Sequence, residues 1–184
     1  MPKHFKKVLV ANRGEIAIRI IRALHEMEIA SVAVYSEADR TSSHISMAEE
    51  AYPIGEAPSL ESYLNIPKIL KVAKNARVDA IHPGYGFLSE NDEFAEACEE
   101  AGITFIGPKA ETMRQLGDKI KSREMMIKEK IPVVPGSKEP VTSFFHAKKI
   151  AHELKYPVVV KASAGGGGKG MRIVKSEKDI EKWM

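Results

Sequence analysis

The sequence predicts an α/β protein that begins with an open parallel sheet carrying helices on both faces, in a Rossmann-like arrangement. Strand-like and helix-like segments alternate from residue 7 to residue 107, with short connections between them. This alternation favours parallel pairing, because consecutive parallel strands need a crossover helix. The runs KVLV and SVAV are also largely apolar, as expected of strands that are buried on both faces.

Five strand-like runs would form this sheet. In chain order they cover residues 7–12, 31–36, 51–55, 78–82 and 103–107. Ligands of such sheets bind beyond the carboxyl ends of the strands. The polar residues 12–15 follow the first run, and residues 82–90 follow the fourth. These two loops are therefore the first places to expect a site.

The helices between these runs show apolar periodicity and recognisable caps. They are expected over 15–27, over 43–49, after Asn65 and after the SEND motif at 89–92. Ser42 or Ser43 would open the short second helix, and Asn65 would cap the third. SEND has the spacing of a capping box, so its serine would open the fourth helix. Gly102 would end that helix.

From residue 108 the pattern changes, and we place a second domain at 115–184. Helices are expected over 109–116, over 118–130 with Asp118 at its start, and over 143–154, with a proline-containing hinge at 131–137. The strands PVVVKAS and MRIVKS then enclose a run of glycines. SEKD at 176–179 is a second capping box that begins a helix carrying Trp183 near the end of the chain. A helix this short is not stable without other segments to pack against, so we expect this chain to be a piece of a longer protein.

Composition excludes several functional classes. The formal charge is only +3, and the basic residues are interspersed with acidic ones, unlike a nucleic-acid-binding face. Cys98 is the single cysteine, so no internal disulfide can form, and its helical surroundings predict a buried hydrophobe. No apolar run approaches the length of a membrane span, and the first residues lack a signal-peptide core. These features favour a cytoplasmic location.

The stretch KASAGGGGKGMRIV at 161–174 is the clearest candidate for phosphate binding. A P-loop is excluded, because Gly170 follows Lys169 where serine or threonine is required. A dinucleotide fingerprint is matched formally, but it requires a helix directly after the glycines, and MRIV alternates like a strand. The remaining interpretation is a lid between two strands, whose backbone N–H groups and lysines contact phosphate.

Two weaker signals are not assigned to sites. The loop at 12–15 has one glycine where a dinucleotide fingerprint has three, although Asp39 lies where a ribose-binding acid would be. We therefore expect Gly14 to permit a tight turn and predict no nicotinamide site. The acidic pairs Asp92-Glu93 and Glu99-Glu100 lie among other charges on an expected helix. We expect a solvated helix face there, without a metal.

Four stretches together resemble one protein family: ANRGEIAIRIIRAL, AIHPGYGFLSEN, FIGPKAETMRQLGDK and YPVVVKASAGGGGKGMRIV. They are similar to the biotin carboxylase component of biotin-dependent carboxylases, of the acetyl-CoA, propionyl-CoA or pyruvate carboxylase type. The resemblance covers essentially all 184 residues in order. It implies a Rossmann-like amino-terminal domain at 1–114 and the incomplete start of an ATP-grasp domain at 115–184.

The resemblance implies an ATP-dependent ligase. ATP would phosphorylate bicarbonate to carboxyphosphate, which then carboxylates biotin on a carrier protein, with Mg²⁺ as cofactor. The implied partners are the biotin carrier protein, a carboxyltransferase subunit and further copies of the same protein. In the family, the residues that bind magnesium, bicarbonate and biotin lie in a more carboxyl-terminal part. We therefore expect this chain alone to be inactive, with weak nucleotide binding at most.

The resemblance also implies two sets of site residues and assigns a catalytic step to none of them. The ATP-binding set is Lys119, Lys161, Gly165, Gly166, Gly167, Gly168, Lys169 and Gly170. Lys169 departs from the family pattern, which often has arginine there. The loop that faces the active site contains His82, Gly84, Tyr85, Gly86, Glu90 and Asn91.

Two other interpretations stay open. Another ATP-grasp ligase, such as carbamoyl-phosphate synthase or the carboxylase of purine synthesis, would share the sheet followed by a lid. A non-catalytic folding or dimerisation module would keep the first domain without the reaction. A change in the thermal stability of the chain on addition of ATP would indicate a nucleotide-binding site. No change would favour the non-catalytic module.

Overall fold

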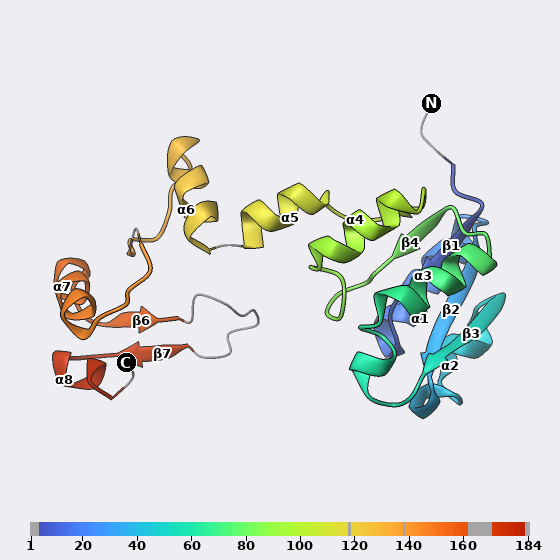
Figure 1. Ribbon diagram of the computed structural model, residues 1–184, viewed down its shortest axis with the longest axis horizontal. Helices are drawn as coiled ribbons and strands as arrows, with labels where there is room; N and C mark the ends of the chain where they lie inside the picture. The colour runs from blue at the N-terminus through green and yellow to red at the C-terminus, as the bar shows by residue number, and fades with distance from the viewer. Residues whose placement is uncertain (1–3, 118, 138, 162–170, 183–184) are drawn as a thin grey trace. The chain divides into compact units, whose positions relative to one another are not determined.

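The computed structural model describes residues 4–117, 119–137, 139–161 and 171–182 (Figure 1). The chain divides into two compact units, Met1–Arg114 and Gln115–Met184. Within the described residues, no helix is long and apolar enough to cross a membrane.

The first unit is built on a five-stranded sheet. Its strands are β1 (Lys7–Val10), β2 (Ala30–Ser36), β3 (Glu50–Gly55), β4 (Ala80–His82) and β5 (Thr104–Phe105). They run in the order β3-β2-β1-β4-β5, and every neighbouring pair is parallel. The predicted open parallel sheet is confirmed. In β1, Val10 pairs with His82 of β4, so these two strands end together.

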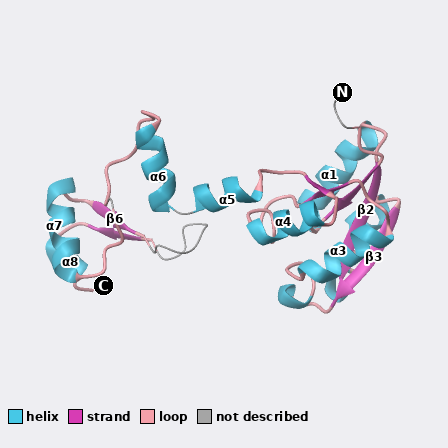
Figure 2. Ribbon diagram, turned by 45° about the horizontal axis from the view of Figure 1, so that its top comes forward, coloured by secondary structure: helices cyan, strands magenta, loops and turns pink. Residues whose placement is uncertain are grey.

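Helices cover both faces of this sheet, as predicted (Figure 2). The helices are α1 (Gly14–Glu26), α2 (Ser43–Met47), α3 (Ile66–Asn75) and α4 (Asp92–Glu100), with short 3-10 turns at Glu37–Asp39 and Ser59–Glu61. Val8 and Val10 of β1 join a core with α1, whereas Leu9 joins a core with α3 and α4. Alternate residues of one strand therefore enter opposite cores.

The helix caps follow the sequence with one correction. Asn65 accepts a hydrogen bond from the Lys68 N–H at 3.0 Å and caps α3, as predicted. The serine of SEND does not open α4. The cap is Asn91, whose Oδ1 accepts from the Phe94 N–H at 2.7 Å. The reason is that the chain is still turning at Ser89, whose N–H donates to the carbonyl of Gly86, so the helix begins only at Asp92.

Cys98 is a structural residue of the core between the sheet, α3 and α4. It is fully buried among apolar side chains. Burial raises the pKa of its thiol to about 12, which keeps it protonated and unreactive at neutral pH. The predicted buried hydrophobe is confirmed.

The second unit contains short helices and a hairpin. Its elements are α5 (Ala110–Gly117), which begins in the first unit, α6 (Lys119–Lys128), α7 (Phe144–Leu154), β6 (Val158–Val160), β7 (Arg172–Val174) and α8 (Glu177–Ile180). β6 and β7 pair antiparallel, with Val158 opposite Val174, so two strands do flank the glycine stretch. The capping box of Ser176 and Asp179 is confirmed. Asp118 and Trp183 lie outside the described residues.

Candidate functional site

Two loops meet at the carboxyl edge of the parallel sheet, where such folds hold their ligands. Residues 11–13 connect β1 to α1, and residues 83–91 follow the neighbouring strand β4. The Ala11 N–H donates to the His82 carbonyl at 2.9 Å, which extends the pairing of the two strands into the loops. The two segments that the sequence marked for a site are thus brought together.

Asn12 joins the two loops through its side chain. It is only 3% exposed. Its Nδ2 donates to the carbonyl of Pro83 at 2.7 Å and to that of Tyr85 at 2.8 Å. Its Oδ1 accepts from the N–H of Arg13 at 2.9 Å. Both amide hydrogens and the amide oxygen are therefore satisfied, as a buried amide requires.

His82 holds the same loop from the side of β4. Its Nδ1 accepts a hydrogen bond from the Gly84 N–H at 3.0 Å, so Nδ1 carries no proton and the neutral ring is protonated at Nε2. Burial lowers the pKa of His82, which favours this neutral form at physiological pH. The imidazole therefore serves as an acceptor for the loop backbone.

Gly84 and Gly86 give the loop its shape. Their φ angles are 67° and 68°, in the left-handed region that side chains disfavour. A Cβ on Gly84 would lie 2.8 Å from Nδ2 of Asn12, so glycine is needed there for space as well. A Cβ on Gly86 would meet no atom within 4 Å, so its requirement is conformational alone.

The other three loop residues that the sequence marked differ in their roles. Tyr85 is 62% exposed, and its hydroxyl donates to Oε2 of Glu15 at 3.3 Å. Glu90 is exposed. Asn91 uses its side-chain oxygen to cap α4. Tyr85 and Glu90 are thus exposed to solvent, whereas the Asn91 side chain fixes the point at which the loop ends and α4 begins.

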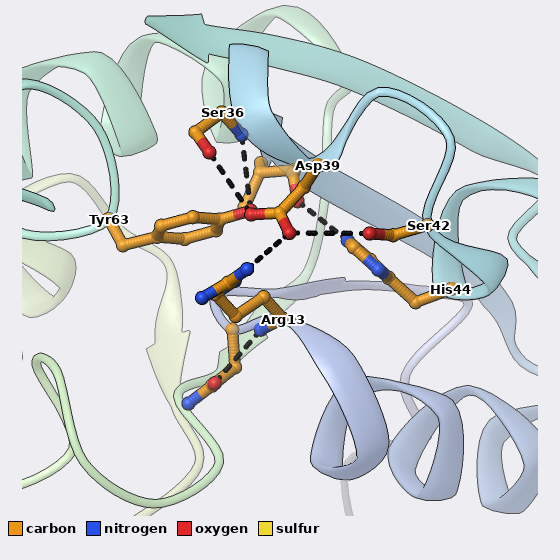
Figure 3. A network of polar contacts seen from close by, with 8 residues as sticks. Arg13, Ser36, Asp39, Ser42, His44 and Tyr63 are labelled. Atoms are coloured by element: carbon orange, nitrogen blue, oxygen red, sulfur yellow. Dashed lines mark hydrogen bonds and ion pairs between the residues drawn. The ribbon is translucent and has the colours of Figure 1, made fainter. Parts of the chain in front are cut away.

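A buried carboxylate lies further along the same edge, and sequence reasoning missed its role. Asp39 is 5% exposed and accepts from Nη2 of Arg13 at 2.5 Å. Three hydroxyls also donate to it: Tyr63 at 2.8 Å, Ser36 at 3.0 Å and Ser42 at 3.2 Å. Figure 3 shows these side chains converging on Asp39. The network joins the loop after β1 to the carboxyl end of β2, to the first 3-10 turn and to the residues just after the second 3-10 turn.

This network leaves the Asp39 carboxylate little capacity to accept a hydrogen bond from a ribose. Four donors already occupy its carboxylate, so a sugar hydroxyl would have to displace one of them. Burial opposes ionisation, but the hydrogen bonds from Arg13, Tyr63 and Ser36 outweigh it and lower the pKa of Asp39. Ser42 precedes α2 as expected, yet its hydroxyl turns to Asp39 and makes no cap bond. No sequence motif marks Tyr63, which packs here only through the fold.

The predicted nucleotide residues all belong to the second unit. Lys161 follows β6 directly and is exposed, and Lys119 is the first residue of α6. Gly165, Gly166, Gly167, Gly168, Lys169 and Gly170 lie outside the described residues. Val159 and its register partner Ile173 are exposed on one face of the hairpin. Lys161 therefore stands at the end of a strand with an open apolar face.

Two family models match the chain in succession. The biotin carboxylase N-terminal domain matches residues 4–113. The ATP-binding domain of the carbamoyl-phosphate synthase L chain matches residues 118–184. Together the two matches span almost the whole chain.

Relatives of known function are about half identical to the chain. Biotin carboxylase 1 of Bacillus subtilis is 52% identical over 175 residues, which are 95% of this chain and 39% of that protein. Pyruvate carboxylase of Staphylococcus aureus is 54% identical over 180 residues, which are 97% of this chain and 16% of that protein. The chain therefore spans well under half the length of these relatives.

A solved structure has the same fold. The biotin carboxylase domain of 2-oxoglutarate carboxylase from Hydrogenobacter thermophilus, a dimer in complex with MgADP, ADP and bicarbonate, superposes with a TM-score of 0.92 at 52% identity. The match covers 98% of this chain and 40% of that one.

Proposed function

Because the chain belongs to the biotin carboxylase family, we propose that it supplies the sheet domain and the phosphate-binding hairpin of an ATP-dependent biotin carboxylase. In that reaction the γ-phosphoryl group of ATP passes to bicarbonate, and the resulting carboxyphosphate carboxylates biotin on a carrier protein. The observation that carries the proposal is the pinned loop His82–Asn91 at the carboxyl edge of the sheet. Such an edge is where parallel α/β folds hold ligands.

The two units have separate roles in this proposal. Residues 1–114 form the biotin carboxylase N-terminal domain, and residues 115–184 form the start of an ATP-grasp domain. His82, Gly84, Tyr85, Gly86, Glu90 and Asn91 form the loop that faces the active site. The exposure of Tyr85 and Glu90 beside backbone that is firmly held supports this assignment, since a site needs preorganised groups within reach of substrate.

The nucleotide contacts belong to the second unit, at the start of α6 and in the hairpin of β6 and β7. Lys119, Lys161 and Lys169 would neutralise phosphate charge, while Gly165, Gly166, Gly167, Gly168 and Gly170 would let backbone N–H groups approach it. The antiparallel pairing of β6 and β7 supports a lid whose tip is the glycine stretch. Phosphoryl transfer depends chiefly on positioning and charge neutralisation, which lysines and backbone amides can provide.

Magnesium does not fit the residues described. Mg²⁺ needs carboxylate oxygens, and the described part of the chain holds no group of three or more histidine, cysteine, aspartate or glutamate side chains that could hold a metal. Asp92, one of the acidic residues considered from the sequence, pairs with Arg114 at 2.5 Å. We expect the chain to lack carboxylation activity by itself.

The wider assembly is part of the proposal. Its partners are a biotin carrier protein, a carboxyltransferase subunit and a second copy of the protein. A dimer is described for the 2-oxoglutarate carboxylase domain, which shares the fold. A cytoplasmic location remains a prediction from the sequence.

One alternative has its own support. The second unit matches the ATP-binding domain of the carbamoyl-phosphate synthase L chain, another ATP-grasp ligase. The match of residues 4–113 to the biotin carboxylase N-terminal domain favours the biotin enzyme. Biotin-dependent release of ADP by the complete enzyme, with no response to ammonia, would distinguish them.

A thermal-shift titration tests whether the nucleotide site is retained. ATP should raise the melting temperature of the chain by an amount that grows with the logarithm of the ratio of ATP concentration to Kd, and Lys161→Ala should abolish that shift. Lys149→Ala is the matched control, because Lys149 is exposed on α7 of the same unit. A shift that survives Lys161→Ala, or is lost equally in the control, would contradict the assignment of Lys161. No shift with the unmodified chain would favour the non-catalytic module.

A further inference from the structure

Three backbone groups of residues 83–85 are held by side chains from outside that segment. Asn12 donates to the carbonyls of Pro83 and Tyr85, and His82 accepts from the N–H of Gly84. Pro83 has no N–H of its own to offer a regular ladder. The loop therefore keeps its path through these side-chain bonds, and Asn12 makes two of the three.

The contact between Asn12 and the loop is also a close one. The missing side chain of Gly84 leaves the space in which Nδ2 of Asn12 sits, since a Cβ there would lie 2.8 Å from Nδ2 and 3.2 Å from Cγ. Asn12 is itself fixed, because the N–H of Arg13 donates to its Oδ1 and because it is 3% exposed. A buried side chain whose polar atoms are all hydrogen-bonded can fix its partners in one position.

We propose that Asn12 is the positioning residue of the active-site-facing loop. It sets the backbone of Pro83 and Tyr85, and so the place of the exposed Tyr85 side chain, without contacting substrate itself. The inference rests on the proposed function, in which residues 82–91 face the reacting groups. It follows that Asn12 governs the step served by this loop and leaves the affinity for ATP, which belongs to the second unit, unchanged.

The substitution Asn12→Asp distinguishes the shape of the side chain from its ability to donate hydrogen bonds. It keeps the size of the side chain and the acceptor for the Arg13 N–H, but replaces the two N–H donors with an oxygen that faces two carbonyls. Asn65→Asp is the matched control. Among the described contacts, the Asn65 side chain acts as an acceptor at the start of α3, where a carboxylate caps equally well.

The first measurement is amide hydrogen exchange on the 184-residue chain. We expect residues 84–89 to exchange at least about tenfold faster in Asn12→Asp, while the amides of β1 and β2 keep the rates of the unmodified chain. Asn65→Asp should leave both regions unchanged. Gly84→Ala disrupts the same contact, because the added Cβ would lie 2.8 Å from Nδ2 of Asn12. It should also accelerate exchange at residues 84–89. Unchanged exchange at residues 84–89 in Asn12→Asp would overturn the proposal.

The second measurement uses a complete biotin carboxylase that carries these 184 residues. Misplacement of a reacting group by about 1 Å costs roughly 10²-fold in rate, so kcat with saturating biotin and bicarbonate should fall on that scale in Asn12→Asp. KM for ATP should stay at the value of the unmodified enzyme. A parallel rise in KM for ATP would show a general structural role and overturn the proposal. If the unmodified enzyme lacks ATP- and bicarbonate-dependent biotin carboxylation, the proposed function fails, while hydrogen exchange still decides the role of Asn12.

Discussion

Arg13 reaches from the loop after β1 to the buried carboxylate of Asp39 beyond β2, with Nη2 2.5 Å from Oδ1. The two ends of this ion pair differ in exposure, at 49% for the Arg13 side chain and 5% for that of Asp39. Water hardly reaches the Asp39 carboxylate, so this group depends on donors from the protein for its hydrogen bonds. The ion pair restrains Arg13, which directly follows Asn12. It therefore helps to hold Asn12 in place against the carbonyls of Pro83 and Tyr85.

Removal of Asp39 should destabilise the first unit more than removal of Arg13. Asp39→Ala leaves three hydroxyl donors without their acceptor, and buried unsatisfied polar groups cost about 1–3 kcal/mol each. Some hydroxyls can turn to other partners, so we expect a loss of about 2–3 kcal/mol in the free energy of unfolding. Arg13→Ala leaves the carboxylate hydrogen-bonded to its three hydroxyls and removes a half-exposed partner, so it should cost about half as much. Urea denaturation measures both, and the reverse order would contradict the role given to Asp39.

The Asp39 network should make folding sensitive to acid. The pKa of Asp39 is lower in the folded chain, where burial is outweighed by the hydrogen bonds from Arg13, Tyr63 and Ser36. The ionised Asp39 carboxylate therefore stabilises the folded chain fully above the pKa of an unfolded carboxyl, about 4. This contribution is lost as the pH falls through the lower pKa of Asp39 in the folded chain. Glu49 and Glu50 also have lowered pKa values and act in the same direction.

Substitution of Asp39 by asparagine tests this assignment. In urea unfolding between pH 7 and pH 3, Asp39→Asn should reduce the loss of stability below pH 4, because one linked proton is removed. Glu37→Gln is the control, since Glu37 is exposed and pairs only with Arg40 on the surface among its described contacts. An equal pH dependence in Asp39→Asn and the unmodified chain would show that Asp39 is not a main source of acid sensitivity.

The helix cap at Asn91 can be distinguished from the SEND serine. Asn91→Ala removes the acceptor of the Phe94 N–H and should cost about 1 kcal/mol of stability. Ser89→Ala should change the stability little, because Ser89 contributes its backbone N–H to the turn. Thermal or urea unfolding of the two variants compares them directly. A larger loss from Ser89→Ala would restore the capping box that the sequence pattern indicated.

Cys98 should react only when the first unit opens. Its thiol is fully buried and its pKa is raised to about 12 by that burial, so the native chain holds almost no accessible thiolate. An aromatic disulfide reagent should therefore label it at the rate of unfolding. Labelling should become rapid in urea above the transition. Fast labelling of the native chain, with the fold intact by circular dichroism, would contradict the described packing.

Local patterns in the sequence were enough to predict the parallel sheet, both helical faces and the strands that flank the glycines. KVLV and SVAV become β1 and β2, because continuous apolar runs suit strands covered on both sides. Asn65 and Ser176 were identifiable as caps because a cap bond spans only three residues. The family was identifiable for the same reason, since its signature stretches are continuous in the chain.

Contacts between distant segments were decided only by the tertiary structure. Asn12 meets Pro83 and Tyr85 because β1 and β4 are neighbours and end together, although more than 70 residues separate them in the chain. Asp39 occupies a position that suits a ribose-binding acid, yet the fold surrounds it with Arg13 and three hydroxyls. A residue's type shows what it can donate or accept, but its partners depend on strand order and register. For that reason the sequence alone could locate the loop at residues 82–91, and the folded chain was needed to show what holds it.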